Sequence, residues 1–296
     1  MEKILKQNRE SLSDNSIKTY SSNIRSLYKK MNTDTQSTPE SIHKFFNTNS
    51  KKVLDFLKDI EPSKRKTVLA SLVVLCNGNS AAESYRSQMI KDAYSYNENL
   101  KDQTKTDSQK ASWITQDNVM KIYRRLYRNS LPLINKDKLT NHELQELQDL
   151  VILSVYVLIP PRRLLDYTLF KVRNAGEKDN FMDGKHFVFN TYKTANKYKQ
   201  QRVLIPTRLK SLITKWMTKH NNDYLLFDER NNPLAPPKLT SRLNRIFGGR
   251  NISVNQLRHT FITDRVLPNV PALKMLQGVA EDMGHSVETQ LLYKKN

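Results

Sequence analysis

The feature that most constrains the fold is an apolar stretch near the middle of the chain that ends at two consecutive prolines. Its apolar residues recur at helical spacing: Leu144, Leu147, Val151, Val155 and Leu158. Positions between them, such as Ile152 and Val157, are apolar too, so this helix should be buried on most sides. Pro160-Pro161 must end it, because the second proline pushes the residue before it out of the helical region.

Patterns on both sides of this helix indicate the fold class. The residues before position 100 read as helices. After the prolines, three short segments favour strands: 168–172, 186–190 and 202–205. Helical patterns then return at 207–219, 239–246, 254–266 and 270–283. We therefore predict a mainly α protein with a small antiparallel β-sheet, an α+β fold.

A polar stretch divides the chain. Residues 97–112 have almost no apolar content and read as an interdomain linker or a frayed helix end. The 296 residues suit about two domains, each large enough to bury its own core. We predict a helical domain over 1–100, a linker over 101–112 and a domain of helices and strands over 113–296.

Charge gives the first indication of function. The chain has 49 Lys and Arg against 29 Asp and Glu, a formal net charge of +20, and a pI near 9.8. A folded chain this basic usually binds a polyanion, most often nucleic acid. A merely soluble basic surface is the simpler alternative.

Composition excludes several other classes. A mean hydropathy of −0.67 and the lack of a long uncharged apolar run exclude a spanning helix, and no convincing membrane-binding amphipathic helix is found. Residues 1–6 have no apolar stretch of signal-peptide length. The single cysteine, Cys76, excludes an internal disulfide framework and a cysteine-based zinc site. We expect an intracellular, reduced protein without a metal or cofactor.

Basic residues of the helical domain are candidate nucleic-acid contacts. Lys18 and Arg25 lie opposite the apolar face of a predicted helix. Lys64, Arg65 and Lys66 open a later helix, where cations oppose the helix dipole. Phosphates would supply the compensating charge, although a solvated turn is equally consistent with the pattern.

Four separated pieces carry residue types suited to phosphoryl transfer. They are Pro160-Pro161-Arg162-Arg163, Lys193 in the hairpin tip, Asn255-Gln256-Leu257-Arg258-His259-Thr260, and Gly284-His285-Ser286 followed by Tyr293. Each alone is weak, because such arginines, lysines and tyrosines usually lie on the surface or pack. Their order and spacing along the chain carry the information.

In this order the pieces resemble the tyrosine recombinase family, the phage-type integrases. The family has an arginine in a turn, a lysine in a β-hairpin, a His-x-x-Arg-His box, a Gly-His-Ser turn and then a tyrosine. The match runs from about Trp113 to Asn296, and Asp166 stands where the family has an acidic residue. The resemblance implies a catalytic domain over 113–296 and a DNA core-binding domain over 1–100, which together clamp double-stranded DNA.

The resemblance also implies the chemistry: a site-specific recombinase that cuts and rejoins DNA through a 3′-phosphotyrosine, without metal or ATP. Tyr293 would be the nucleophile. Arg163 and Arg258 would hold the non-bridging phosphate oxygens. Lys193 would protonate the leaving 5′-oxygen, and His285 would bond the phosphate. A homodimer on one site, a homotetramer in the synaptic complex, a viral or mobile-element source and residence in the host nucleus or cytoplasm are further implications.

The sequence departs from the family at one catalytic position. Asn255 replaces the first histidine of the box, and an amide can donate to a phosphate oxygen but cannot exchange a proton near pH 7. Arg162 is the alternative to Arg163 in the site, and Lys197 is the alternative to Lys193. If they are not catalytic, both are candidate DNA contacts. His259 is a further candidate contact, or it orients a neighbour.

Three alternatives stay open beside the recombinase. A type IB topoisomerase uses the same catalytic set, but its box usually has lysine where this chain has Asn255. A catalytically retired DNA-binding protein would explain Asn255 yet not the survival of the other site residues. A metal nuclease is the weakest, because no cluster of carboxylates or histidines has metal-ligand spacing.

Overall fold

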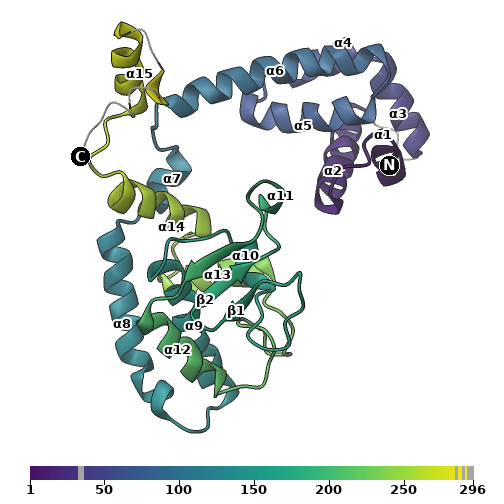
Figure 1. Ribbon diagram of the computed structural model, residues 1–296. Coiled ribbons are helices and arrows are strands. Elements are labelled where there is room, and N and C mark those ends of the chain that lie inside the picture. Colours follow the sequence, from purple (N-terminus) through teal and green to yellow (C-terminus); the bar gives the residue numbers. More distant parts are fainter. Residues whose placement is uncertain (33–36, 284–285, 289–290, 292–296) are drawn as a thin grey trace. The chain divides into compact units, whose positions relative to one another are not determined.

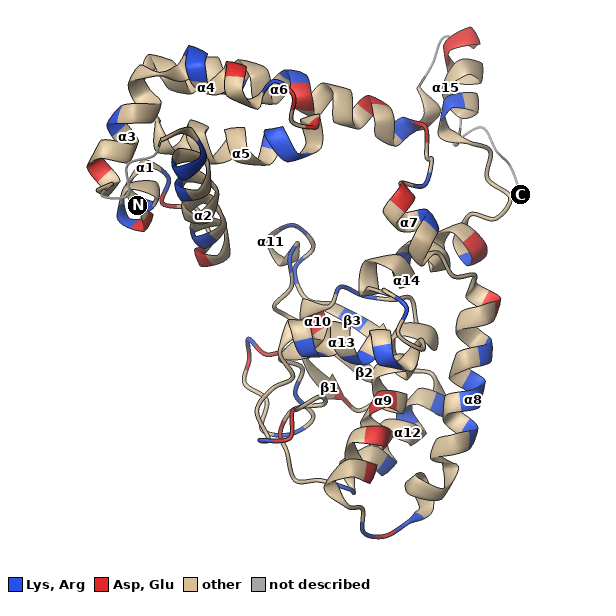
Figure 2. Cartoon of the chain, turned by 180° about the vertical axis from the view of Figure 1, so that it is seen from behind, with Lys and Arg blue, Asp and Glu red and all other residues tan. Residues whose placement is uncertain are grey.

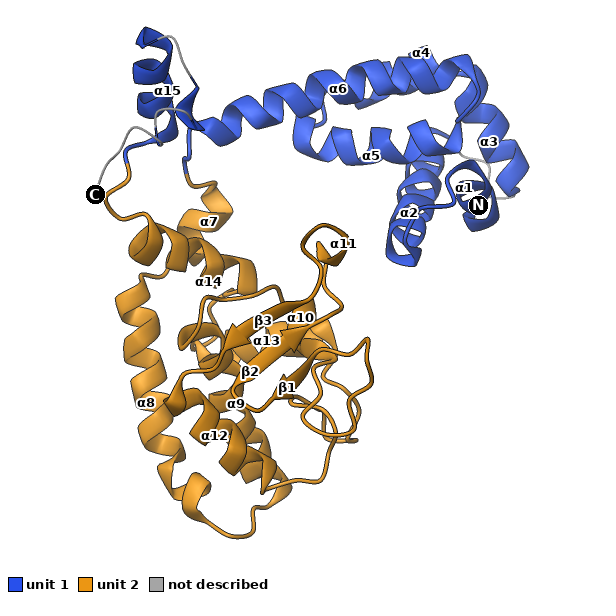
Figure 3. Cartoon of the chain, in the orientation of Figure 1, with its two compact units in different colours: residues 1–104, 271–296 blue, residues 105–270 orange. Residues whose placement is uncertain are grey.

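The computed structural model describes residues 1–32, 37–283, 286–288 and 291, and it divides into two compact units (Figures 1 and 3). Unit 1 comprises residues 1–104 and 271–296, and unit 2 comprises residues 105–270. Of the described residues, 63% are helical and 5% lie in strands, which confirms the predicted mainly α, α+β class. Within these residues no helix has the length and apolar character needed to cross a membrane.

Unit 1 consists of helices. They are α1 (Glu2–Asn8), α2 (Asp14–Met31), α3 (Pro39–Thr48), α4 (Ser50–Leu57), α5 (Pro62–Leu75), α6 (Ser80–Lys101) and α15 (Leu273–Asp282). Side-chain caps begin several of them: the hydroxyl of Ser13 accepts from the Ser16 amide at the start of α2. Helices α5 and α6 pack along each other, and the Tyr85 hydroxyl of α6 donates to the Phe46 carbonyl across the core at 2.8 Å.

Unit 2 combines helices with a small sheet. Its helices are α7 (Asp107–Ser112), α8 (Gln116–Asn135), α9 (Asn141–Val157), α10 (Leu165–Thr168), α11 (Ala195–Tyr198), α12 (Thr207–Met217), α13 (Pro236–Ile246), α14 (Val254–Phe261) and the π-helical turn η1 (Ile262–Val266). Its strands are β1 (Phe181–Asp183), β2 (His186–Phe189) and β3 (Gln201–Leu204).

Helix α9 is the predicted central helix, and its burial is confirmed. Every residue from Leu147 to Val157 is buried, and α8, α12 and α13 pack around it. The buried Gln148 pairs with the backbone of Phe227, donating to its carbonyl at 2.9 Å and accepting from its amide at 2.8 Å. The helix thereby accommodates a polar side chain without leaving its amide unsatisfied.

The sheet is antiparallel in the order β1-β2-β3, with Met182 opposite Phe187 and Phe187 opposite Val203. The strand predicted at 168–172 is wrong: Thr168 ends α10, and Lys171 alone among the residues after it pairs with the sheet, through one isolated bridge to Phe181 of β1. Their apolar content serves the core instead, because Phe170 is fully buried against the rings of Phe187 and Phe189. The loop amides bond locally, as Lys171 N does to the Asn180 carbonyl at 2.8 Å.

The boundary between the units falls between Thr104 and Lys105, inside the segment 101–112. That segment contains the end of α6 and the whole of α7, which begins with a capping box at Thr106 and Gln109. Helix α15, part of the range 113–296, groups with unit 1. The Lys274 ammonium pairs there with Asp102, and the Leu273 amide donates to the Gln103 side chain at 2.8 Å.

Candidate functional site

A depression in unit 2 brings together two arginines that are distant in the sequence. Arg163 follows α9, where Pro160 and Pro161 turn the chain, and Arg258 belongs to α14. Both line a cavity of about 450 Å³, the arginine pocket, together with Asp166 and the hairpin residues Tyr192, Thr194, Tyr198 and Gln201. The fold thus joins two of the four motif pieces in one place, together with the hairpin residues on either side of Lys193.

The guanidinium groups of Arg163 and Arg258 have no hydrogen-bond or ion-pair partner among the residues that the structure describes. Both side chains are half-buried. Burial lowers the pKa of Arg258, and the neighbouring Arg163 lowers it further, since two cations close together oppose each other's charge. The pair therefore forms a pre-arranged double cation whose charge an anion in the pocket would balance.

Arg162 has a different position from Arg163. Its Nε donates to Asp166 Oδ2 at 2.9 Å and its Nη1 to Gln201 Oε1 at 2.8 Å. The guanidinium carbon lies 3.8 Å from the ring centre of Phe189 and 5.1 Å from that of Tyr192. Arg162 is thus engaged within the protein, and it connects the turn after α9 to both ends of the hairpin tip.

Asp166 is almost completely buried, with 1% of its surface exposed. Burial raises the pKa of its carboxyl group, while the nearby Arg162 opposes the rise. Oδ2 accepts from Arg162, whereas Oδ1 has no hydrogen-bond partner in the described part of the chain. The acidic residue of the motif therefore orients Arg162 and leaves Arg163 unpaired.

The hairpin tip between β2 and β3 carries the candidate lysines. Lys193 is exposed and lies between Tyr192 and Thr194, which both line the arginine pocket. Lys197, in the short helix α11, is also exposed, and its ammonium lies 5.2 Å from the ring centre of Tyr198. Neither lysine belongs to the lining of the pocket, and Lys193 is the one whose two neighbours in the sequence do.

A buried amide fixes the base of this tip. Asn180 Nδ2 donates to the carbonyls of Asp166 at 3.1 Å and Thr191 at 2.8 Å. Its Oδ1 accepts from the amides of Asn190 at 2.9 Å and Thr191 at 2.8 Å. At the far end of the tip, the Tyr192 hydroxyl donates to the Lys199 carbonyl at 2.6 Å. Sequence patterns missed Asn180, because an isolated polar residue between short strands carries no spacing signal.

Helix α14 presents Arg258 to the pocket. Ser253 caps the helix by accepting from the Gln256 amide, and the Thr260 hydroxyl donates to the Ile114 carbonyl at 2.8 Å. These bonds fix the helix, on which Asn255 and Arg258 are neighbours at i and i+3. Asn255 is exposed and does not line the pocket, and His259 is exposed as well.

The candidate contacts of unit 1 fall into two groups. Lys18 and Arg25 on α2 and Lys64 on α5 are exposed, and the Lys66 ammonium lies 4.1 Å from the ring centre of Tyr96. Arg65 instead faces inward.

The guanidinium of Arg65 is used inside unit 1. Its Nε and Nη2 donate to the two carboxylate oxygens of Asp92 at 2.8 and 2.6 Å, and Nη1 donates to the Lys58 carbonyl at 2.6 Å. Asp92 is buried, so this bidentate pair joins α5 to α6. Its geometry explains why a cation can stand near the start of α5 without an external anion.

Two candidates, His285 and Tyr293, lie outside the described residues. Their roles remain those implied by the resemblance.

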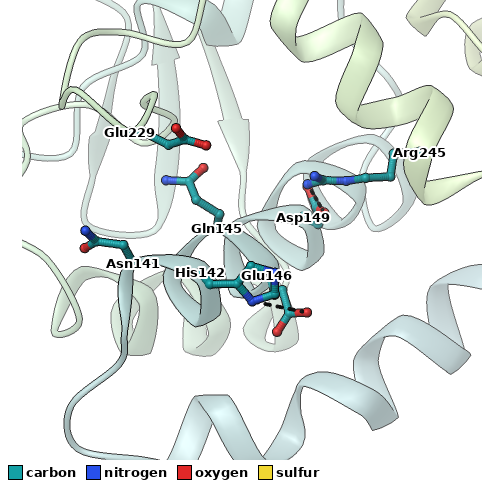
Figure 4. Close-up of a pocket in the computed structure, with 7 residues that line it drawn as sticks. All are labelled: Asn141, His142, Gln145, Glu146, Asp149, Glu229 and Arg245. Atoms are coloured by element: carbon teal, nitrogen blue, oxygen red, sulfur yellow. Dashed lines mark hydrogen bonds and ion pairs between the residues drawn. The ribbon is translucent and has the colours of Figure 1, made fainter.

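A second cavity of about 460 Å³ lies at the start of α9 (Figure 4). Figure 4 shows Arg245 pointing to Asp149, which it contacts at 2.7 Å, and His142 pointing to Glu146 at 3.8 Å. Arg242 also pairs with Asp149 at 2.7 Å. The cations around this cavity are already neutralised by carboxylates, so it lacks the unpaired charge of the arginine pocket.

The described residues contain no group of three or more His, Cys, Asp or Glu side chains placed to hold a metal ion. Cys76 is buried, and burial raises the pKa of its thiol to about 12, which keeps it from acting as a thiolate. Comparisons of the chain with protein-family models and with curated proteins find no match.

Proposed function

We propose that this chain is a site-specific DNA recombinase of the tyrosine type, an integrase that cuts and rejoins double-stranded DNA. The observation that carries the proposal is the arginine pocket, where Arg163 and Arg258 converge beside the single carboxylate of Asp166 and neither makes a side-chain hydrogen bond or ion pair in the described part of the chain. Holding two unpaired cations in a half-buried site disfavours the empty state, and a phosphodiester would relieve that cost.

Each residue has a defined part in the reaction. The two guanidiniums bind the non-bridging oxygens of the scissile phosphate and stabilise the charge that develops there in the transition state. The Tyr293 oxygen attacks phosphorus as its proton passes to water. The bond to the 5′-oxygen breaks, and Lys193 donates the proton that makes it a hydroxyl. The products are a 3′-phosphotyrosine and a free 5′-hydroxyl, and attack by a second 5′-hydroxyl reverses the step.

Remaining contacts follow from the motifs. His285 donates to the phosphate, and Asn255 donates to DNA near Arg258 without transferring a proton. Lys18, Arg25, Lys64 and the other exposed cations of unit 1 bind the DNA backbone, which gives most of the affinity and a steep dependence on salt. Two copies occupy one site, and four form the synaptic complex.

Plasmid relaxation in EDTA, with detection of SDS-stable protein–DNA adducts, tests the proposal. Wild-type protein is expected to relax supercoils and form adducts that proteinase removes, whereas Tyr293→Phe forms none. Arg163→Ala and Arg258→Ala are expected to lose about 10²–10³ in cleavage rate, as when one preorganised donor to a developing oxyanion is removed. Arg250→Ala, which removes an exposed arginine outside the pocket, is the matched control and should keep full activity.

Other results would point elsewhere. Adducts formed by Tyr293→Phe would mean that another residue is the nucleophile. DNA binding without adducts by the wild type, on plasmids and on the DNA flanking its own gene, would favour the retired DNA-binding protein. Relaxation without any joining of two different duplexes would favour the topoisomerase.

A further inference from the structure

Helix α8 of unit 2 carries a row of cations on one side: Lys121, Arg124, Arg125 and Arg128. Residues at i, i+3, i+4 and i+7 share one face of an α-helix, and with a rise of 1.5 Å per residue the row is about 10 Å long. All four side chains are exposed. Figure 2 shows the blue segments following one another along α8.

These cations have no acidic partner. In the described part of the chain none of the four makes a hydrogen bond or an ion pair. Asp117, the one acid in the sequence of α8, lies 4.0 Å from Arg265 instead. The four charges therefore face one another and the solvent, and like charges at these spacings destabilise a helix.

Some cations on other helices are paired with an acid of the same helix. An acid three residues earlier pairs with the cation in each of four cases: Asp55–Lys58, Glu83–Arg86, Glu98–Lys101 and Asp107–Lys110. The row on α8 lacks this arrangement at every position. The charge of the row is therefore available to an external anion.

An arginine from a second helix packs on another side of α8. Arg208, at the start of α12, is exposed, and its guanidinium carbon lies 4.5 Å from the ring centre of Tyr127 and 5.3 Å from that of Tyr123. Tyr123 is fully buried, so Arg208 covers the side of α8 that faces the core and does not belong to the row. The four residues Lys121, Arg124, Arg125 and Arg128 are named the α8 cationic face.

We propose that the α8 cationic face binds the phosphate backbone of duplex DNA at a place separate from the scissile phosphate. It shares no residue with the arginine pocket, whose lining comes from the turn after α9, the hairpin and α14. Three of its four cations are arginines, whose planar forks match phosphate oxygens in pairs. The contact positions DNA without reading its bases. The inference rests on the proposed function in requiring DNA as the partner.

The test compares two variants that lose the same charge. One carries Lys121→Gln, Arg124→Gln, Arg125→Gln and Arg128→Gln. The control carries Lys178→Gln, Lys185→Gln, Arg230→Gln and Arg250→Gln, whose exposed side chains lie on separate loops of unit 2. Affinity for a fluorescent duplex is measured by anisotropy between 50 and 200 mM salt, a range over which phosphate contacts weaken strongly.

The α8 variant is expected to lower the slope of log affinity against log salt by roughly 2 to 4, since each lost phosphate contact removes about 0.9. The control should change the slope by less than about 1. Equal slopes for the two variants would overturn the proposal, because net charge alone would then explain binding. Failure of the wild type to bind duplex DNA would overturn it as well.

Two further measurements complete the test. The α8 variant should have a melting temperature no lower than that of the wild type, because it loses only the repulsion between like charges on α8. Arg125→Glu is a second variant, which keeps the helix charged and soluble. The same proteins are assayed for relaxation and adducts. If the wild type forms adducts but the α8 variant and the control have equal salt slopes, only the α8 contact is refuted. If the α8 variant lowers the slope but the wild type forms no adducts, the recombinase proposal is refuted and the α8 contact is supported.

Discussion

Replacing Arg162 by alanine should destabilise unit 2 and displace the hairpin, although the unpaired arginines beside it remain. The change removes the side-chain donor to Asp166 Oδ2, which lies 2.9 Å from Arg162 Nε. It also removes the bond to Gln201 and the stacking on Phe189. Because Asp166 is 1% exposed, water cannot replace these contacts without the site opening.

The magnitude follows from the burial of the pair. Removing one partner of a buried ion pair typically costs about 3–5 kcal/mol, because the remaining charge is uncompensated. Proton uptake by Asp166 limits the loss, so we expect a decrease of about 3 kcal/mol in the free energy of unfolding near pH 8. For a domain of this size that corresponds to a fall of roughly 6–12 °C in the melting temperature.

The loss should depend on pH. Burial raises the pKa of Asp166 in the folded protein and Arg162 opposes that rise, so the Arg162→Ala variant has a still higher pKa. A folded state that holds its proton more tightly than the unfolded chain is destabilised as the pH rises above the ordinary carboxyl value of about 4. The deficit relative to the wild type therefore shrinks as the pH is lowered from 8 toward 4.

Urea unfolding of four proteins at pH 5 and pH 8 measures this: wild type, Arg162→Ala, Asp166→Asn and the double variant. The double variant should be more stable than Arg162→Ala at pH 8, because no buried charge is left unpaired. A double variant no more stable than the single one, or a deficit that is the same at both pH values, would refute the reasoning. As a positioning residue, Arg162 should also lower relaxation activity when removed, with partial rescue by Arg162→Lys.

Two further predictions concern stability. Arg65→Ala should lower the free energy of unfolding of unit 1 by about 3 kcal/mol, because it leaves the buried Asp92 unpaired. Lys64→Ala, at the exposed neighbouring residue, should change it by no more than about 0.5 kcal/mol. Equal effects of the two substitutions in urea titrations would contradict the inward role of Arg65. Burial lowers the pKa of His220 to about 4, so the unfolded chain takes up the proton first and stability should fall by about 2–3 kcal/mol as the pH drops from 6.5 toward 4. His220→Phe should remove that part of the pH dependence. If this variant shows the same loss of stability in acid as the wild type, His220 is not the group responsible.

The sequence predicted the features that depend on local periodicity. Apolar spacing was sufficient for the buried helix α9, because burial on most sides leaves a near-continuous apolar run. The hairpin was also predictable, since β2 and β3 flank a polar, basic tip. The motif order placed Arg163 and Arg258 in one candidate site, and both line the same pocket.

Other features depend on partners that are distant in the chain. Arg162 and Arg163 are adjacent and identical in type, and only the packing against Gln201 and Phe189 distinguishes them. A local signal was present, because Asp166 stands four residues after Arg162. Arg65 gave no such signal, since Asp92 lies on the next helix.

The strand predicted at 168–172 failed for a related reason. Apolar residues at strand-like spacing indicate that a segment is buried. They do not indicate which backbone groups the segment forms hydrogen bonds with. Phe170 is buried in the core, while the amides around it bond to loops.

The anchoring of the hairpin tip has a thermodynamic consequence for any ligand that it closes upon. Asn180 holds the backbone at the first end of the tip, and Arg162 bonds the Gln201 side chain at the other end, so residues 193–199 are the part left to be ordered by a bound molecule. Fixing a residue costs about 1–2 kcal/mol of conformational entropy, and within this span α11 is already helical. The conformational entropy lost when the tip closes is therefore confined to a few residues. Lys193 can move to the pocket without the whole hairpin becoming ordered.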